Sequence, residues 1–284
     1  MKKHFVWLLF AVSTVLFALP AQAETPENFS HYYRQDCTFV VDGAADNNDW
    51  CNRGNAQGKA PNVVLIGDSY GNSVTTILEE YARTASKQIV YEQYGRGQCP
   101  EMLGIGPKGC GDFAQAVYER IKKMPSVKTV VLVSHWVYYF GETRRWNDDA
   151  RIYTRVEMQK ALAETIKAYQ ALGKKVVFVY QAPEIDEPKA CVQRRIRIAA
   201  AEDKCQMTKE WGLRNEVYRP FVDPILVELK VETFDPFDFM CDDKSCKVKE
   251  GDKIFFASQA HFSGFGGQYL ARKAALDLKK LLQF

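Results

Sequence analysis

The sequence predicts an α/β protein in which a mainly parallel, five-stranded sheet lies between two layers of helices. Short apolar runs rich in β-branched residues, such as 63–66 and 129–133, are typical of strands buried on both faces of a parallel sheet. Segments with helical periodicity separate these runs, and such alternation indicates a sheet covered on both sides. No internal repeat or low-complexity linker divides the chain, so we expect one large domain.

The expected elements alternate along the chain. The strands are Val63–Ile66, Gln88–Tyr94, Thr129–Val133, Lys175–Tyr180 and Val231–Phe234. The helices are Thr75–Ala85, Phe113–Lys123, Val156–Leu172, Cys191–Ala201, Trp211–Leu229 and Phe262–Leu282. By analogy with flavodoxin-like sheets, the strand order is 2-1-3-4-5, and its switch point lies beside the first strand. Residues 46–55 and 137–151 are expected to be irregular.

The N-terminus has the pattern of a secretory signal peptide. Lys2 and Lys3 precede an apolar stretch over 5–19, and Ala21-Gln22-Ala23 forms a small-residue cleavage motif. A membrane anchor is the rival interpretation, but this stretch is short for a span. We therefore expect cleavage after Ala23 and export, to a bacterial periplasm.

The rest of the chain divides simply. We expect a signal peptide at 1–23, an N-terminal arm at 24–60 and the main domain at 61–284. No later segment is apolar for long enough to cross a bilayer. The formal net charge of +3 is nearly balanced, which argues against a nucleic-acid partner.

All eight cysteines lie beyond the signal peptide. An even count in an exported protein indicates disulfides, and the grouping favours sequential pairs, although eight cysteines allow about 105 pairings. The favoured pairs are Cys37–Cys51, Cys99–Cys110, Cys191–Cys205 and Cys241–Cys246. Zinc is the rival interpretation, but no Cys-x-x-Cys motif occurs and only three histidines remain after processing. We therefore expect no metal and no cofactor.

Ser69 follows the first strand at a sharp turn. Gly67 ends the apolar run, Asp68 and Ser69 come next, and a helix-compatible segment begins soon after. A serine at this place presents its hydroxyl at the carboxyl end of a strand, where open α/β sheets bind ligands. Backbone N–H groups at the start of the helix can face a developing oxyanion. Ser69 is therefore a candidate nucleophile, and helix capping by Asp68 and Ser69 is the alternative.

His261 is the candidate base. It lies just before the last expected helix, and a serine nucleophile needs a base within hydrogen-bond reach. A cap or a packed ring is the alternative role for a single histidine at this position.

With these residues the chain resembles the SGNH (GDSL-type) hydrolase family, and within it the periplasmic SGNH domain that accompanies membrane acyltransferases of acyltransferase family three. Gly67-Asp68-Ser69 is similar to the first family block, and His261 is similar to the histidine of the Asp-x-x-His block. The resemblance runs from about Pro61 to the C-terminus. It also rests on further pieces in the same order: Ser134-His135-Trp136, Ala182-Pro183, Cys191, Arg194, Asp235-Pro236, Cys241, Cys246, His261-Phe262-Ser263 and Gly266.

The resemblance implies the SGNH hydrolase fold and a set of roles. Ser69 would attack an ester carbonyl and His261 would take its proton. The Ser69 N–H and an N–H of Gly95 or Gly97, where the second family block falls, would bind the oxyanion. The asparagine of the third block has no counterpart at 134–136, so one oxyanion donor, worth ~3 kcal/mol, is missing from the pattern.

Ser258 is the sharpest departure from the family pattern, because it stands where the family has an aspartate three residues before the histidine. Loss of the equivalent carboxylate in serine proteases costs roughly 10⁴ in rate. Asp235, Asp238, Asp252 or a backbone carbonyl could orient His261 instead. A relative that kept the fold but lost turnover is therefore a second hypothesis.

We expect an exported serine esterase or O-acyltransferase that moves or removes a small acyl group, such as acetyl, on a cell-envelope glycan. A membrane acyltransferase partner is implied by the resemblance. The alternative is a catalytically impaired glycan-binding or assembly subunit. Side chains that could contact substrate are Asp68, Asn72, His135, Trp136, Trp146, Arg144, Arg145, Arg194, Arg195 and Arg197.

Overall fold

A computed structural model describes residues 49–54, 58–84, 88–106, 109–140, 144–146, 149–185, 207–213, 216–251 and 253–282. The expected signal peptide, most of the arm and the expected helix 191–201 lie outside these ranges. Within them, no helix combines the length and apolar character needed to cross a bilayer.

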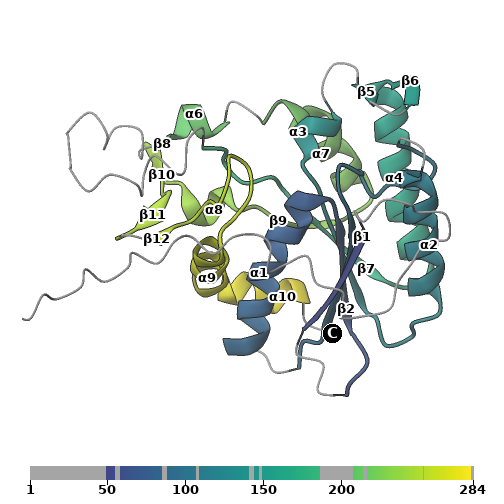
Figure 1. Ribbon diagram of the computed structural model, residues 1–284, viewed down its shortest axis with the longest axis horizontal. Helices are drawn as coiled ribbons and strands as arrows, with labels where there is room; N and C mark the ends of the chain where they lie inside the picture. Colours follow the sequence, from purple (N-terminus) through teal and green to yellow (C-terminus); the bar gives the residue numbers. More distant parts are fainter. Residues whose placement is uncertain are drawn as a thin grey trace, which may run out of the picture.

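The core of the molecule is a six-stranded sheet (Figure 1). Its strands, in spatial order, are β1 (Asp49–Gly54), β3 (Tyr91–Arg96), β2 (Val63–Gly67), β4 (Thr129–Val133), β7 (Lys175–Val179) and β9 (Glu232–Phe234). The strands from β3 to β9 are parallel, and their order is the 2-1-3-4-5 order expected from the sequence, which is confirmed.

β1 was not expected. It pairs antiparallel with β3 at the edge of the sheet, so the prediction of irregular structure at 46–55 is wrong for 49–54. The stretch 137–151 also differs from the prediction, because it contains a short helix and a hairpin. These elements are α3 (Trp136–Tyr139), β5 (Arg144–Trp146) and β6, which continues to 153 (Asp149–Tyr153).

Helices cover both faces of the sheet. The longer ones are α1 (Ser69–Thr84), α2 (Cys110–Lys122), α4 (Arg155–Ala171), α7 (Arg219–Glu228), α9 (Gly264–Lys273) and α10 (Ala275–Leu282). The shorter elements are β8 (Met207–Thr208), α6 (Lys209–Leu213), η4 (Glu216–Tyr218), α8 (Phe237–Met240), β10 (Ser245–Cys246), β11 (Lys249–Glu250) and β12 (Lys253–Ile254).

Alternate residues of each central strand enter two different cores. In β2, Val63 and Leu65 pack with α1, α9 and α10, whereas Val64 and Ile66 pack with α2, α4 and α7. Every residue of β2 and β4 is buried. This two-sided burial explains why these strands appear in the sequence as continuous apolar runs rather than as an alternating pattern.

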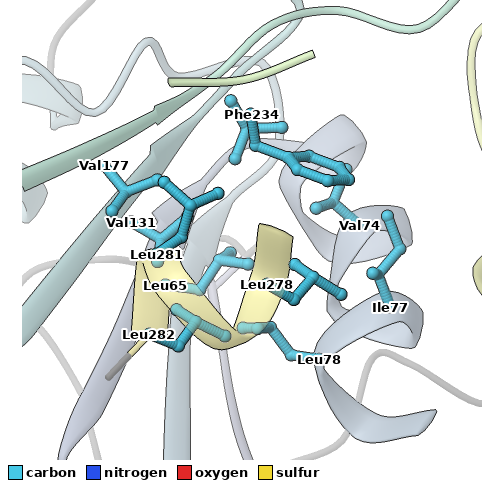
Figure 2. Close-up of a pocket in the computed structure, with 11 residues that line it drawn as sticks. Leu65, Val74, Ile77, Leu78, Val131, Val177, Phe234, Leu278, Leu281 and Leu282 are labelled. Atoms are coloured by element: carbon cyan, nitrogen blue, oxygen red, sulfur yellow. The ribbon is translucent and has the colours of Figure 1, made fainter. Parts of the chain in front are cut away.

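The core on the α1 side contains a small apolar pocket (Figure 2). Leucines of α10 close it against α1 and the strands, and Phe234 of β9 lines one side. No candidate site residue lines this pocket. We therefore assign it to the packing of α10 rather than to substrate binding.

Two of the expected disulfides lie within the described ranges. Cys99 pairs with Cys110 and joins the loop after β3 to the start of α2. Cys241 pairs with Cys246 and closes the turn before β10. The other two expected pairs include Cys37, Cys191 and Cys205, which lie outside the described residues.

The contact between α1 and α9 joins two segments that lie far apart in the sequence. Gly267 of α9 lies so close to α1 that a Cβ atom there would be 1.9 Å from Thr76 Oγ1 and 2.9 Å from the Thr76 carbonyl carbon. A glycine at this point lets the two helix backbones approach each other. The loop that precedes α9 is thereby held beside the first turn of α1.

Gly267→Ala should therefore lower the free energy of unfolding by about 1–3 kcal/mol, because the added methyl group overpacks this contact. In a helix without such a neighbour, the same change would stabilise by roughly 1 kcal/mol. Gly111→Ala in α2 is the matched control, since nothing lies within 3.8 Å of its added Cβ. Urea denaturation measures both. Equal stabilisation by the two substitutions would contradict the close contact.

Candidate active site

Ser69 is the first residue of α1 and lies two residues beyond β2. The preceding Asp68 fixes this turn, because its Oδ1 accepts hydrogen bonds from the N–H groups of Tyr70 (2.9 Å) and Gly71 (3.3 Å). This is the helix-capping role that the sequence suggested as an alternative, and Asp68 performs it. Ser69 remains half-buried, with its hydroxyl at the carboxyl edge of the sheet.

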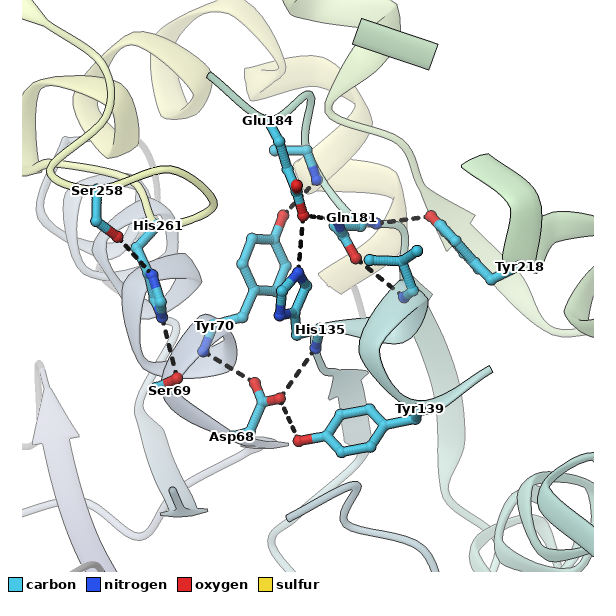
Figure 3. A network of polar contacts seen from close by, with 12 residues as sticks. Asp68, Ser69, Tyr70, His135, Tyr139, Gln181, Glu184, Tyr218, Ser258 and His261 are labelled. Carbon is cyan, nitrogen blue, oxygen red and sulfur yellow. Dashed lines mark hydrogen bonds and ion pairs between the residues drawn. The ribbon is translucent and has the colours of Figure 1, made fainter. Parts of the chain in front are cut away.

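His261 lies beside this hydroxyl. Its Nε2 is 3.0 Å from Ser69 Oγ, although 192 positions separate the two residues (Figure 3). A tight turn holds the imidazole, since the Ala257 N–H donates to the His261 carbonyl at 3.0 Å. The structure thus brings the expected nucleophile and base into the geometry that proton transfer requires.

Ser258 occupies the far side of the imidazole. Its Oγ lies 2.8 Å from His261 Nδ1 (Figure 3). Of the substitute carboxylates suggested from the sequence, Asp235 and Asp238 have no hydrogen bond or ion pair to His261 among the described contacts. Asp235 pairs instead with Arg219 at 2.7 Å and accepts from the Phe237 N–H, Asp238 lies in α8, and Asp252 lies outside the described residues. A hydroxyl group therefore orients His261.

This substitution changes the electrostatics of the base. A serine hydroxyl can accept a hydrogen bond from Nδ1–H and so fix the tautomer, but it brings no negative charge to stabilise an imidazolium. Burial lowers the pKa of His261, while the nearby charges of Asp68 and Glu184 raise it and that of His135 lowers it. Because burial is the largest of these effects, His261 is held neutral, as a proton acceptor must be.

The glycines expected to bind an oxyanion lie at the end of β3. Gly95 pairs with Gly67 on one side and with Trp50 on the other. Gly97 lies in the turn beyond the last paired residue and is half-buried. Since β2 and β3 are parallel, both glycines lie at the same edge of the sheet as Ser69.

Three side chains expected to contact substrate are buried instead. Asp68 is 2% exposed, Asn72 is 0% exposed and Trp136 is 1% exposed. Asn72 accepts from Asn52 Nδ2 at 3.2 Å, and the Trp136 indole stacks on Phe178 and donates to the Val179 carbonyl. These contacts tie the three side chains into the packing around the sheet, and the expectation that they contact substrate stays a prediction.

His135 does face the site. Its Nε2 lies 2.7 Å from Glu184 Oε1, which also accepts from Gln181 Nε2 at 2.6 Å. The backbone N–H of His135 donates to Asp68 Oδ2, and the Tyr139 hydroxyl donates to the same oxygen. The His135 side chain is 29% exposed, so it is open to a ligand.

Sequence reasoning missed Tyr70 and Glu184. The Tyr70 ring centroid lies 6.4 Å from that of His135 and 6.5 Å from that of His261, and its hydroxyl accepts from the Ala182 N–H (Figure 3). Glu184 follows β7 by five residues. An acidic residue soon after a buried parallel strand is the signal that could have indicated it, because the carboxyl ends of such strands share one edge.

The remaining expected contacts are not tested by the geometry. Arg144, Arg145 and Trp146 form β5, of whose side chains nothing is described, and Arg194, Arg195 and Arg197 lie outside the described residues. Across the described part of the chain, no three His, Cys, Asp or Glu side chains are grouped to hold a metal ion.

Comparison with known families and structures identifies the class of protein. A family model for the SGNH domain, described as fused to AT3 domains, matches residues 36–275. The chain therefore belongs to the SGNH family. A comparison with curated proteins gave no match.

Solved structures are similar to this chain at low sequence identity. The periplasmic domain of the Salmonella ser. Paratyphi A lipopolysaccharide acetyltransferase is 16% identical, with a TM-score of 0.59 over 77% of this chain and 84% of that chain. A carbohydrate acetylesterase from Sinorhizobium meliloti is 12% identical, with a TM-score of 0.45 over 78% and 99% of the two chains.

Proposed function

We propose that the protein is an exported serine-dependent enzyme that moves or removes a small acyl group, such as acetyl, on a hydroxyl group of a cell-envelope glycan. The observation that carries this proposal is the 3.0 Å contact between Ser69 Oγ and His261 Nε2 at the carboxyl edge of the sheet. It joins a hydroxyl to a neutral, buried imidazole, which is the arrangement that activates a serine.

In the proposed reaction, Ser69 Oγ bonds to the carbonyl carbon of the acyl donor while its proton passes to His261 Nε2. The tetrahedral intermediate collapses to an acyl-enzyme, and water or a sugar hydroxyl then takes the acyl group. Ser258 holds the imidazole with its Nδ1 proton directed away from Ser69.

Backbone N–H groups would stabilise the oxyanion. The Ser69 N–H, at the start of α1, is one donor. Of the two glycines, we favour Gly97 as the other. Gly95 is paired with strands on both sides, so its N–H group has backbone carbonyls to bind. Gly97 lies beyond the last paired residue of β3. We do not assign the third donor that an asparagine would supply to Asn72, because this side chain is buried beside the Asn52 amide.

The choice of acyl group, acceptor and partner rests on the family. Its description as a domain fused to AT3 domains supports a membrane acyltransferase as the source of the acyl group. The similar solved domain belongs to a lipopolysaccharide acetyltransferase, which supports acetyl and an envelope glycan. The signal-peptide pattern at 1–23 supports export to the periplasm.

A second candidate function is a glycan-binding or assembly subunit that has lost turnover. The observation that favours it is the Ser258 hydroxyl in the place of a carboxylate. Without a negative charge behind the imidazole, the charged intermediate of the proton transfer is less stable.

A serine-reactive phosphonate probe separates these two functions. We expect the probe to label the wild-type protein at Ser69, because the contact with His261 raises the reactivity of that hydroxyl, and not to label Ser69→Ala. Intact-protein mass spectrometry of the folded proteins detects the adduct. If folded wild-type protein stays unlabelled, the binding subunit is the correct description.

A further inference from the structure

The site contains two imidazoles, and their partners differ. His261 contacts the nucleophile but is oriented by a hydroxyl group. The other imidazole, that of His135, has its ring centroid 6.4 Å from that of Tyr70 and is oriented by a carboxylate, that of Glu184, at 2.7 Å. An imidazole held by a carboxylate is the usual form of a general base in acyl transfer, and here it is not the one beside the serine.

The free edge of His135 points to a role with substrate. A carboxylate oxygen only accepts, so the Nε2 that faces Glu184 carries a proton. Nδ1 then holds a second proton when the ring is charged and a lone pair when the ring is neutral, so this atom can either give or take a proton. No group in the described ranges hydrogen-bonds to this Nδ1. The side chain is 29% exposed and is fixed in place by the backbone hydrogen bond to Asp68 and by stacking on Tyr138.

Given the proposed acyl-enzyme on Ser69, on which this inference rests, we propose that His135, oriented by Glu184, is a second catalytic residue that exchanges a proton with the oxygen of the substrate. His261 would then serve only the Ser69 oxygen. The two histidines lie within electrostatic reach of one another, since the charge of His135 is one of the influences on His261.

The proton transfers balance without another reactant. In acylation, Ser69 Oγ bonds to the acyl carbon and gives its proton to His261. The bond from that carbon to the donor oxygen breaks, and this oxygen takes a proton from His135. In transfer, the acceptor oxygen bonds to the acyl carbon and gives its proton to His135. The bond to Ser69 Oγ then breaks, and Ser69 regains its proton from His261, so both rings end as they began.

The charges around each ring fit this division. Glu184 places a carboxylate against His135, which stabilises the charged ring that gives its proton to the donor oxygen in the first half of the reaction. His261 is buried against the Ser258 hydroxyl, which suits a ring that rests neutral. If His261 acted alone, it would have to exchange protons with both Ser69 and the substrate oxygen, and its partner Ser258 carries no negative charge.

The activated ester p-nitrophenyl acetate tests the proposal, because its leaving group needs no protonation and only the second half of the reaction needs His135. For His135→Gln, we expect one equivalent of p-nitrophenol in a rapid burst. Steady turnover should then be about 100-fold slower than in the wild type. Acetylated Ser69 should accumulate and be seen by intact-protein mass spectrometry. Glu184→Gln should show the same behaviour to a smaller degree, about 10-fold.

Phosphonate labelling of Ser69 serves as the internal reference. In His135→Gln it should proceed within about threefold of the wild-type rate, since Ser69 and His261 are untouched. Glu119→Gln, on the exposed face of α2, is the matched control and should behave as wild type.

Two results would overturn the role of His135. One is steady turnover of His135→Gln within about threefold of wild type, and the other is loss of labelling together with turnover, which indicates mere support of the Ser69 site. If the phosphonate probe does not label the wild-type protein, the proposed function is wrong, and the role of His135 that depends on it is wrong too.

Discussion

Replacing His261 by glutamine should lower ester turnover by about 10⁴-fold or more. Glutamine keeps a polar side chain of similar reach but cannot take the Ser69 proton, which passes across the 3.0 Å contact in the proposed mechanism. Steady-state hydrolysis of p-nitrophenyl acetate measures the loss, and the rate of phosphonate labelling should fall in parallel.

The loss of activity must be separated from loss of structure. Because glutamine is polar and of similar reach, and His261 lies in a turn before α9, the variant should unfold in urea within about 1 kcal/mol of the wild type. If a folded His261→Gln protein keeps more than about a tenth of wild-type turnover, another group activates Ser69 and the site assignment is wrong.

Replacing Ser258 by aspartate should raise turnover by about 10²-fold, part of the roughly 10⁴ that the carboxylate is worth in serine proteases. The aspartate would stand 2.8 Å or so from Nδ1, where the Ser258 hydroxyl now lies, and would stabilise the imidazolium. Ser258→Ala is the matched control. It removes the hydroxyl without adding charge and should lower turnover about 10-fold.

The pH dependence of the Ser258→Asp variant gives a second measurement. Only neutral His261 accepts a proton, so activity rises with pH through the pKa of His261, which burial lowers in the wild type. A carboxylate favours the protonated ring, so in Ser258→Asp this rise should move to higher pH while the plateau increases. If the plateau activity of the variant is equal to or below that of the wild type, the Ser258 hydroxyl orients His261 as well as a carboxylate does.

The parallel sheet could be predicted from sequence because its strands are buried on both faces. β2 and β4 are continuous apolar runs for this reason, and the order of the five parallel strands followed by analogy. β1 could not be predicted, because its sequence, Asp49–Gly54, is polar and its strand conformation comes from backbone pairing with β3. Pairing of this kind leaves no periodic signal in the side chains.

The candidate site was predictable only in part. Ser69 and His261 lie at recognisable positions next to a strand and a helix, and the structure brings them together. The burial of Asp68 and Trp136 was not predicted, because burial depends on how the chain packs. Ser258 was recognised as a departure, but the sequence did not show that its own hydroxyl faces the imidazole.

Asp68 connects the two parts of the protein that carry Ser69 and His135. Its two oxygens bind the first turn of α1 and the backbone of His135 after β4, so one buried carboxylate sets the spacing between the serine and the second imidazole. Surface loops at the carboxyl edge of the sheet can consequently lengthen or change in composition while the distance between Ser69 and His135 stays the same. A scaffold built in this way can acquire new acceptors during evolution without having to rebuild its chemistry.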